Sequence, residues 1–450
     1  MPLKQILQNK EIKTIVQESW SISWAMTLIM FLVFLISLAD VYVAGKISKE
    51  IQAAYGLASQ LYFIFSIVAF ALTVGSVSVI SRLFTSGRGD ELREAIDSSL
   101  ISAIIFGFIF GVIGLILSKP IITVLSVPSI LKGFALPLLK IYSIGLLFSY
   151  VLLNTNGILR ASGMIKKSLW TMVLVCVLNV ALNFILAFRT PLGFKGIGVA
   201  TVISTGVGSI LNTLHIRKLI IGRLRFSFAT IKKIFNIGWP AGLLQILWQL
   251  GAMVIFLILG ALPQHSVEIL AAFTNGIKIE SAIFLPAFAF NMANAVVVGN
   301  LLGKKEKENA FQGGMVTAAL GVAVVALLTI IVMLNAHRIA SFLSDNDTVI
   351  IYSTKYIYIS LLVEPIMAWG VILAGGLNGA GDTKSVMASV ALSIWLVRIP
   401  LCYLLGVYIG WGAIAVWWSM NISILVQTLF ISSRYFGRKW IEPAGETVAL

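Results

Sequence analysis

Four polar side chains lie inside long apolar stretches at spacings that could let them hold a proton or a cation. Asp40 stands in "FLISLADVYVAG", with no basic residue within five positions. An ionisable side chain at mid-membrane costs at least ~2.5–3.5 kcal/mol to insert, so its presence needs a reason. Asp40 either reaches the headgroup region at the end of its helix or has a working role in holding a proton or a cation.

Asn179 and Asn183 in "VCVLNVALNFILAF" are spaced i, i+4 and project from one helix face. They could form a hydrogen-bonded contact between helices, which amides often make in membranes. Together with Asp40 and the Thr201 hydroxyl they could instead supply a carboxylate, two carbonyls and a hydroxyl. Such hard oxygen ligands suit Na⁺, whereas the carboxylate alone could carry H⁺.

A second pair of acids lies in the later half of the chain. Glu280 and Glu364 should both sit near the bilayer midplane. They could bind cations or cationic substrates. Alternatively, Glu280 makes a structural hydrogen bond and Glu364 braces the backbone beside Pro365, where we expect a kink. Arg398 needs a counter-charge, for which Glu364 is the candidate.

The composition requires that these residues be positioned by membrane-spanning helices. Of 450 residues 59% are hydrophobic and only 11% are charged, with a mean hydropathy of +0.98. A surface so poor in charge must mostly face lipid. Stretches long enough to span predict twelve helices, approximately 15–43, 52–81, 95–117, 134–156, 169–188, 194–215, 234–261, 269–300, 311–336, 352–377, 386–408 and 411–433.

The basic residues indicate the topology of these helices. If the N-terminus is inside, 22 Lys and Arg fall in inner segments and 9 in outer loops. This bias fits the positive-inside rule with both termini in the cytoplasm. The net charge of +15 is therefore a topology signal, and we expect no nucleic-acid partner. The densest basic stretch, around 215–233, reads as an inner segment that touches anionic lipid heads, or as a regulatory or partner site.

The two halves of the chain repeat. "IQAAYGLASQ" (51–60) resembles "ILAAFTNGIK" (269–278), and "GILRASGMIKKS" resembles "GGLNGAGDTKS", both at an offset of 218. We therefore predict an all-α integral membrane fold of two six-helix lobes related by a pseudo-two-fold axis. The lobes would comprise 1–215 and 234–450, joined by a cytoplasmic linker at 216–233. Parallel repeats of this kind are typical of transporters with the substrate site between the halves.

The repeat also shows which residues belong to the scaffold that both halves share and which occur in one half only. At the matching offsets, the four polar residues of the first half align with Ile258, Leu396, Pro400 and Trp417. The polar set is thus absent from the shared scaffold, which favours a specific role for it.

Several motifs in order give the chain a family resemblance. They are "LADVYVAGKIS", "LRASGMIKKS", "LGFKGIGVATVIS", "LNGAGDTKS" and "WLVRIPLCYLLG". With twelve helices in two lobes, the chain resembles the multidrug and toxic compound extrusion (MATE) transporters over essentially its whole length.

The resemblance implies roles for particular residues. In one branch of that family a helix-one Asp works with a helix-five Asn-x-x-x-Asp and a helix-six Thr, matched here by Asp40, Asn179 and Thr201. Asn183 departs from the pattern, so a single negative charge remains and proton coupling or weaker Na⁺ binding is favoured. Other branches place acids in helices seven and ten. Gln249 stands near the first of these positions, and Glu364 lies about three residues from the second.

The resemblance also implies a function. We expect a cation-coupled antiporter, driven by H⁺ or Na⁺, that exports amphipathic and often cationic compounds by alternating access. A flippase for lipid-linked sugars, of the same superfamily, is the alternative, but it should need more basic residues to meet phosphate. We expect a monomer in the cell (inner) membrane and no cofactor.

An enzyme is not expected. Cys176 and Cys402 lie in apolar runs, and His215, His265 and His337 lie outside the deep part of any span. No metal site is therefore predicted, and no nucleophile motif such as Gly-x-Ser-x-Gly occurs.

Overall fold

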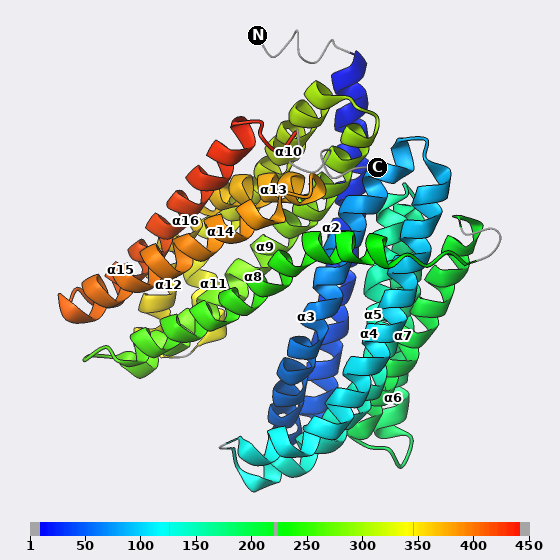
Figure 1. The fold of residues 1–450 in the computed structure, drawn as a ribbon. Coiled ribbons are helices and arrows are strands. Elements are labelled where there is room, and N and C mark those ends of the chain that lie inside the picture. Colours follow the sequence, from blue (N-terminus) through cyan, green and yellow to red (C-terminus); the bar gives the residue numbers. More distant parts are fainter. Residues whose placement is uncertain (1–9, 126, 220–223, 345, 442–450) are drawn as a thin grey trace. The chain divides into compact units, whose positions relative to one another are not determined.

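The computed structural model describes residues 10–125, 127–219, 224–344 and 346–441, and these ranges contain helices and no β-strand (Figure 1). Within them, eleven helices are long and apolar enough to cross a membrane, and one bent helix pair adds a twelfth span. The predicted all-α membrane fold with twelve spans in two lobes is confirmed.

The first six spans are formed by α2 (Lys10–Ile47), α3 (Lys49–Thr85), α4 (Gly89–Val124), α5 (Ser129–Ala161), α6 (Ile165–Phe188) and α7 (Lys195–Ile216). The last six are formed by α8 (Phe228–Gly260), α9 (Ser266–Gly303), α10 (Lys307–Leu334), α12 (Asp347–Leu361) with α13 (Glu364–Gly379), α14 (Thr383–Leu392) continued by η2 (Ser393–Arg398), α15 (Ile399–Tyr403) and η3 (Leu404–Tyr408), and α16 (Gly412–Phe436). Short α11 (Ala336–Leu343) and η1 (Arg217–Leu219) lie in connections.

The helices form two compact units. The first, here the N-unit, holds Leu28–Gly242, and the second, here the C-unit, holds the described residues up to Thr27 and from Leu243 onward. Helices α2 and α8 therefore each contribute one part to either unit. The lobe boundaries expected at 215 and 234 stay a prediction.

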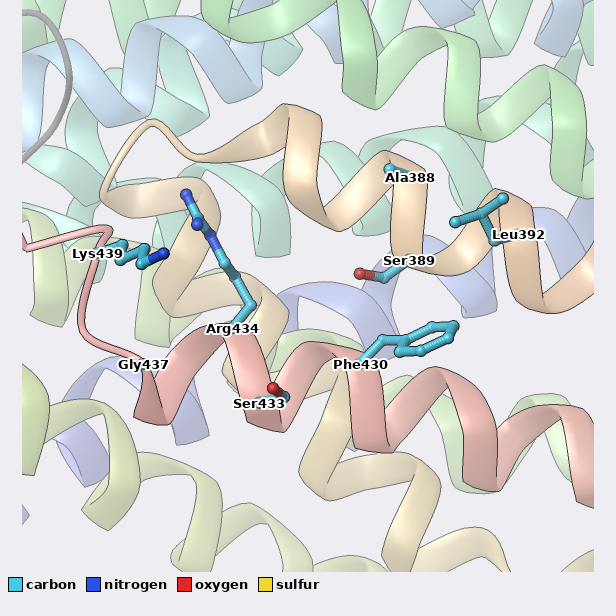
Figure 2. A pocket seen from close by; sticks show the side chains of 8 residues that line it. All are labelled: Ala388, Ser389, Leu392, Phe430, Ser433, Arg434, Gly437 and Lys439. Atoms are coloured by element: carbon cyan, nitrogen blue, oxygen red, sulfur yellow. The ribbon is translucent and has the colours of Figure 1, made fainter.

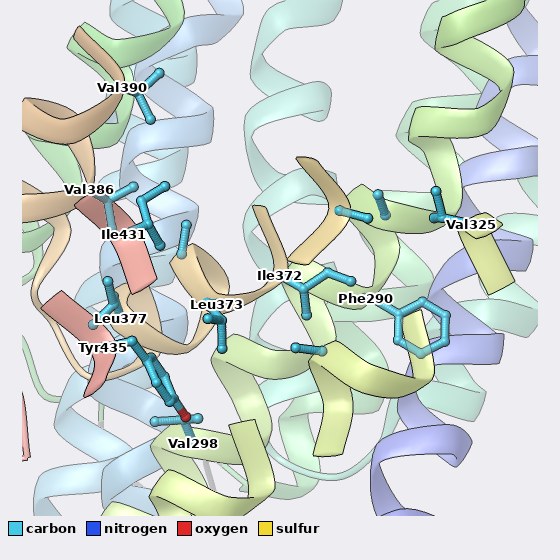
Figure 3. Close-up of a cluster of buried hydrophobic side chains, with 14 of the residues drawn as sticks. Phe290, Val298, Val325, Ile372, Leu373, Leu377, Val386, Val390, Ile431 and Tyr435 are labelled. Atoms are coloured by element: carbon cyan, nitrogen blue, oxygen red, sulfur yellow. The ribbon is translucent and has the colours of Figure 1, made fainter. Parts of the chain in front are cut away.

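The two units pack their helices by the same scheme. In the N-unit α5 packs against α3, α4 and α7, and α6 packs against α7. In the C-unit α13 packs against α9, α10 and α16, and the α14–α15 span packs against α16. Figure 3 shows the apolar centre of the C-unit, to which α9 contributes Phe290, α13 contributes Ile372 and Leu373, and α16 contributes Tyr435. The sequence repeat therefore corresponds to the same pairs of neighbouring helices in the two units.

Buried polar contacts occur at equivalent places in this scheme. In the N-unit, Ser99 Oγ lies 2.6 Å from Ser76 Oγ and donates to Asn154 Oδ1 over 2.9 Å, which connects α3, α4 and α5. In the C-unit, Asn294 stands 218 positions after Ser76, and its Nδ2 donates to the carbonyls of Ile372 (2.8 Å) and Gly314 (3.3 Å). Hydrogen bonds between helices fix these neighbours without a hydrophobic driving force.

The tenth span is broken where the sequence predicts a kink. Helix α12 ends at Leu361, α13 begins at Glu364, and the two axes differ by 51°. Pro365 lies in the first turn of α13, where a missing backbone N–H costs nothing. The expected kink at Glu364-Pro365 is confirmed.

The basic segment before α8 is bound to its own unit. The backbone N–H of Arg225 donates to Asp97 Oδ2 over 2.9 Å, and its Nη1 donates to Asp90 Oδ1 over 2.7 Å. Thr230 Oγ1 donates to Glu94 Oε1 over 2.6 Å. The described part of this segment therefore lies along the acidic first turns of α4. Residues 220–223 of the predicted linker lie outside the described residues.

Candidate functional site

The turn between α2 and α3 places two polar side chains at one depth. Ser48 follows α2 and caps the start of α3. Its Oγ accepts a hydrogen bond from the backbone N–H of Ile51 over 3.2 Å. Asp40 lies eight residues before Ser48, and Tyr55 lies seven residues after it. Antiparallel helices joined by so tight a turn bring such positions level, about 10 Å from the helix ends at 1.5 Å per residue.

The turn between α6 and α7 does the same for a second pair. Asn183 lies five residues before the end of α6, and Thr201 lies six residues after the start of α7. Gly196 lets the two helices approach closely, because a Cβ there would lie 2.6 Å from the carbonyl carbon of Leu186. Asn179 lies one turn farther along the same face of α6.

The two pairs meet at the carboxylate of Asp40. Asn183 Nδ2 donates to Asp40 Oδ1 over 2.5 Å, while Tyr55 Oη and Thr201 Oγ1 donate to Oδ2 over 3.3 and 3.4 Å. Asn179 joins through its neighbours: its Nδ2 donates to Thr201 Oγ1 over 3.3 Å, and its Oδ1 accepts from Asn183 Nδ2 over 3.0 Å. All five residues lie in the N-unit.

The Asp40 cluster holds an acid that meets no basic side chain among the described residues. Asp40 is only 4% exposed, and Asn179 and Asn183 are fully buried. None of the groups that Asp40 contacts in the described chain is basic. An isolated buried charge is costly, and neutral donors offset only part of that cost. The carboxylate therefore gains when it takes up a proton or a cation.

Asn183 occupies a central place in this cluster. Its Nδ2 lies between Asp40 Oδ1 and Asn179 Oδ1 and donates to both. Its Oδ1 is buried and has no hydrogen-bond partner among the described residues. The position where the two neighbouring oxygens converge, which suits a cation, is therefore taken by an amide N–H₂ group.

The structure brings together the four residues expected from the first half: Asp40, Asn179, Asn183 and Thr201. Their role stays a prediction. Sequence reasoning missed Tyr55, whose ring also packs edge-on against Tyr142 at 6.5 Å. The signal was present, because Tyr55 and Asp40 stand at nearly equal distances from the turn.

The acids of the C-unit form a second cluster. Tyr356 Oη donates to Glu280 Oε2 over 2.7 Å, and the carboxyl of Glu364 faces that of Glu280. No other described donor meets the two oxygens of Glu364, which is 1% exposed. Two adjacent carboxyl groups, one buried (Glu364) and one half-buried (Glu280), cannot both stay charged at low cost, so this pair also favours a shared proton or a cation.

Arg398 and Gln249 differ in their relation to these acids. Arg398 Nε donates to Ser423 Oγ over 2.7 Å, and the acid whose charge it meets is Glu280 rather than the expected Glu364. Gln249 is exposed on α8 and makes no hydrogen bond to another described residue. The structure therefore joins Glu280 and Glu364 and leaves Gln249 apart. In the described ranges no group of three or more His, Cys, Asp or Glu could hold a metal.

Two repeated helical units, each with an acid buried within its apolar spans, are features of a membrane transporter. The family profile named MatE matches residues 25–185 and 240–404. The chain therefore belongs to the MatE family, the transporters that the sequence motifs resemble. Members of this family are multi-pass membrane transporters that use ion coupling rather than cofactors.

Two relatives named as transport or resistance proteins agree with this assignment. The chain is 21% identical to the uncharacterized transporter YisQ of Bacillus subtilis over 94% of both chains. It is 24% identical to the probable multidrug resistance protein NorM of Thermotoga maritima, covering 90% of this chain and 89% of that one.

Solved structures share the fold. A MATE transporter in a straight conformation superposes with a TM-score of 0.88 at 19% identity, covering 98% of this chain and 99% of that one. A MOP superfamily transporter from Pyrococcus furiosus, described as having a binding pocket of reverse polarity that suggests a different function, superposes at 0.87 with 18% identity over 98% and 99% of the two chains. At such identities the likeness shows the fold alone.

The contact between Asp40 and Asn183 predicts non-additive stabilities. We expect Asp40→Asn and Asn183→Leu to couple by about 1–3 kcal/mol in a double-mutant cycle, because both remove the same buried hydrogen bond. Denaturant unfolding of the detergent-solubilised protein measures the free energy of unfolding of each variant, and the coupling energy follows from the four values. Asp40→Asn combined with Asn309→Leu in the C-unit is the control and should be additive within about 0.5 kcal/mol. Additivity in both cycles would contradict the contact.

Proposed function

We propose that the chain is a proton-coupled antiporter that exports amphipathic, often cationic compounds by alternating access. The observation that carries this proposal is the Asp40 carboxylate, which is buried among neutral donors and has no basic partner among the described residues. Membership of a family with relatives named as probable multidrug resistance proteins supports the efflux direction.

The Asp40 cluster favours H⁺ over Na⁺ as the coupling ion. Na⁺ needs several oxygens that converge on one point, and the Asn183 amide nitrogen lies between two of the candidates. A proton needs no such shell and neutralises the single charge directly. Sodium binding would require the Asn183 amide to turn its unpartnered Oδ1 toward Asp40.

Protonation would act through the contacts between α2 and its neighbours. The ionised carboxylate accepts from α3, α6 and α7 at once, through Tyr55, Asn183 and Thr201. A neutral carboxyl accepts more weakly, because hydrogen bonds to charged acceptors are about twice as strong. Taking up a proton thus loosens α2 from three helices and shifts the equilibrium between conformations, which couples the proton to substrate release.

The acids of the C-unit would serve the substrate. Glu280 and Glu364 place negative charge beside the aromatic rings of Tyr356, Phe273 and Trp417, which pack at 5.4–5.5 Å. Carboxylates and ring faces together attract organic cations. The alternative is a lipid-linked sugar flippase. Its substrate carries phosphate and would need basic residues, whereas the two clusters are built around acids, which favours organic cations.

We further propose a monomer in the cell (inner) membrane with both termini in the cytoplasm. The lipid bilayer and amphipathic organic substrates would be its partners. The bias of Lys and Arg toward the inner segments supports the orientation. Each acidic cluster is complete within one unit of one chain, so a second copy is not needed to build either site.

The proposal is tested with the full chain reconstituted in liposomes and ethidium as the transported cation. We expect a pH gradient to drive ethidium transport and a Na⁺ gradient to leave it unchanged. Asp40→Asn should reduce the pH-driven rate to that of protein-free liposomes, because the amide cannot exchange a proton. Glu268→Gln, which changes a half-buried acid in the first turn of α9, is the control and should retain the rate. Full pH-driven transport by Asp40→Asn would refute the coupling role.

The Asn183 amide gives a second, independent prediction. Asn183→Asp adds a second carboxylate beside Asp40, so Na⁺ should find two negative oxygen ligands there. We expect an imposed Na⁺ gradient to drive ethidium transport by this variant and not by the wild type. If Na⁺ drives both proteins equally, the amide does not select the ion, and the choice of H⁺ fails.

A further inference from the structure

A groove lies between α14 and α16 of the C-unit, near the end of α16 (Figure 2). It has a volume of about 480 Å³ and two chemically different ends. Arg434 and Lys439 line one end, and Leu392 and Phe430 line the other. The acidic clusters lie elsewhere in the chain, so the groove takes no part in the coupling described above.

The basic end holds one cation that is already oriented. Arg434 Nε donates to Asp382 Oδ2 over 2.6 Å, and Asp382 also accepts from Ser385 Oγ over 2.6 Å. This ion pair fixes the guanidinium beside the groove. It also leaves the two terminal nitrogens of Arg434, Nη1 and Nη2, without a hydrogen-bond partner among the described residues.

Lys439 supplies a second cation that has no partner in the described chain. Its neighbour Arg438 is satisfied, since its Nη1 donates to Glu308 Oε2 over 2.8 Å and its guanidinium lies 4.1 Å from the centre of the Phe311 ring. Lys439 makes neither an ion pair nor a hydrogen bond with a described residue, and Figure 2 shows its side chain directed toward that of Arg434. The pair therefore offers an excess positive charge after Asp382 is counted.

The turn that carries Lys439 is held in one conformation. Trp440 is 1% exposed, its Nε1 donates to the carbonyl of Tyr435 over 2.7 Å, and the two rings lie 4.7 Å apart. Arg438 adopts a left-handed backbone conformation with φ of 57°. The buried Trp440 on one side and the ion-paired Arg438 on the other thus hold Lys439 at the groove, which lowers the entropy cost of binding there.

The apolar end continues as a lipid-like surface along the eleventh span. Leu392 and Phe430 are 45% and 46% exposed, and Leu396, one turn beyond Leu392, is 68% exposed. Apolar side chains this exposed beside a basic site match an acyl chain lying next to a headgroup.

Charge around this end of the unit favours an anionic occupant. The turns at the groove, 382–384 and 434–439, carry four Lys or Arg and one Asp. They lie together, because Arg434 pairs with Asp382. Basic pockets between helices at a membrane surface attract anionic lipid headgroups.

We propose that this groove is a binding site for an anionic phospholipid. The phosphate would lie against Arg434 and Lys439, and one acyl chain would run along Leu392 and Leu396. A lipid in this place would brace α16 against α14. Anionic lipid should therefore stabilise the protein more than a zwitterionic lipid of the same chain length.

The test uses the purified full-length chain in a neutral detergent, with thermal unfolding followed during lipid titration. Dioleoyl phosphatidylglycerol should raise the unfolding temperature at lower concentration than dioleoyl phosphatidylcholine. Lys439→Gln should raise the phosphatidylglycerol concentration for half-maximal stabilisation about five-fold, since one basic residue contributes about 1 kcal/mol to such binding. Lys304→Gln is the control, because it removes the same charge from the same end of the unit, and it should leave this concentration unchanged.

Three results would overturn the proposal. They are an unchanged titration with Lys439→Gln, an equal weakening with Lys304→Gln, and equal stabilisation by the two lipids. A water-soluble headgroup, glycerol phosphate, separates a lipid site from a simple anion site. We expect it to give no stabilisation at the concentrations that suffice for the lipid, and equal stabilisation would show that the groove binds free phosphate instead.

Discussion

The constraint on which the rest of the Asp40 cluster depends is the cost of a buried negative charge. Asp40 has three neutral donors and no basic partner among the described residues. Such a charge persists in an apolar surrounding only if donors converge on it from several helices. Four helices supply the cluster, and their turns at Ser48 and Gly196 bring the side chains level. A change in the charge of this one carboxyl group therefore alters hydrogen bonds that connect α2 to α3, α6 and α7.

The repeated scaffold explains how such a site can exist in one unit alone. Both units connect their central helices through buried polar groups, with Asn294 in the place of Ser76. These contacts hold the helix neighbours whether or not an acid is present. The N-unit then adds Asp40 near the end of a span, and the C-unit adds Glu280 and Glu364 at a different helix contact. The scaffold is shared, whereas the acids are particular to each unit.

The sequence predicted most of the fold because apolar length and repeat register are local signals. It predicted the twelve spans, the kink at Glu364-Pro365 and the grouping of Asp40 with Asn179, Asn183 and Thr201. It did not predict that Arg398 would meet Ser423 and Glu280, since such a partner depends on helix rotation, which hydropathy does not report. The sequence also did not predict which atom of the Asn183 amide faces Asp40. That orientation depends on the acceptors Asp40 and Asn179, which both meet its Nδ2. Tyr55 could have been found by counting residues from the turn.

In the proposed mechanism, Asp40 gives up or takes up one proton as a cationic substrate binds or leaves. Counting the protons exchanged when ethidium binds to the detergent-solubilised protein, in a weakly buffered solution with a pH indicator, tests it most directly. We predict that the wild type releases more protons than Asp40→Asn, by up to one per bound ethidium, while both proteins bind ethidium, because the Glu280–Glu364 pair is the same in both. Proton release that is the same in both proteins would contradict the account.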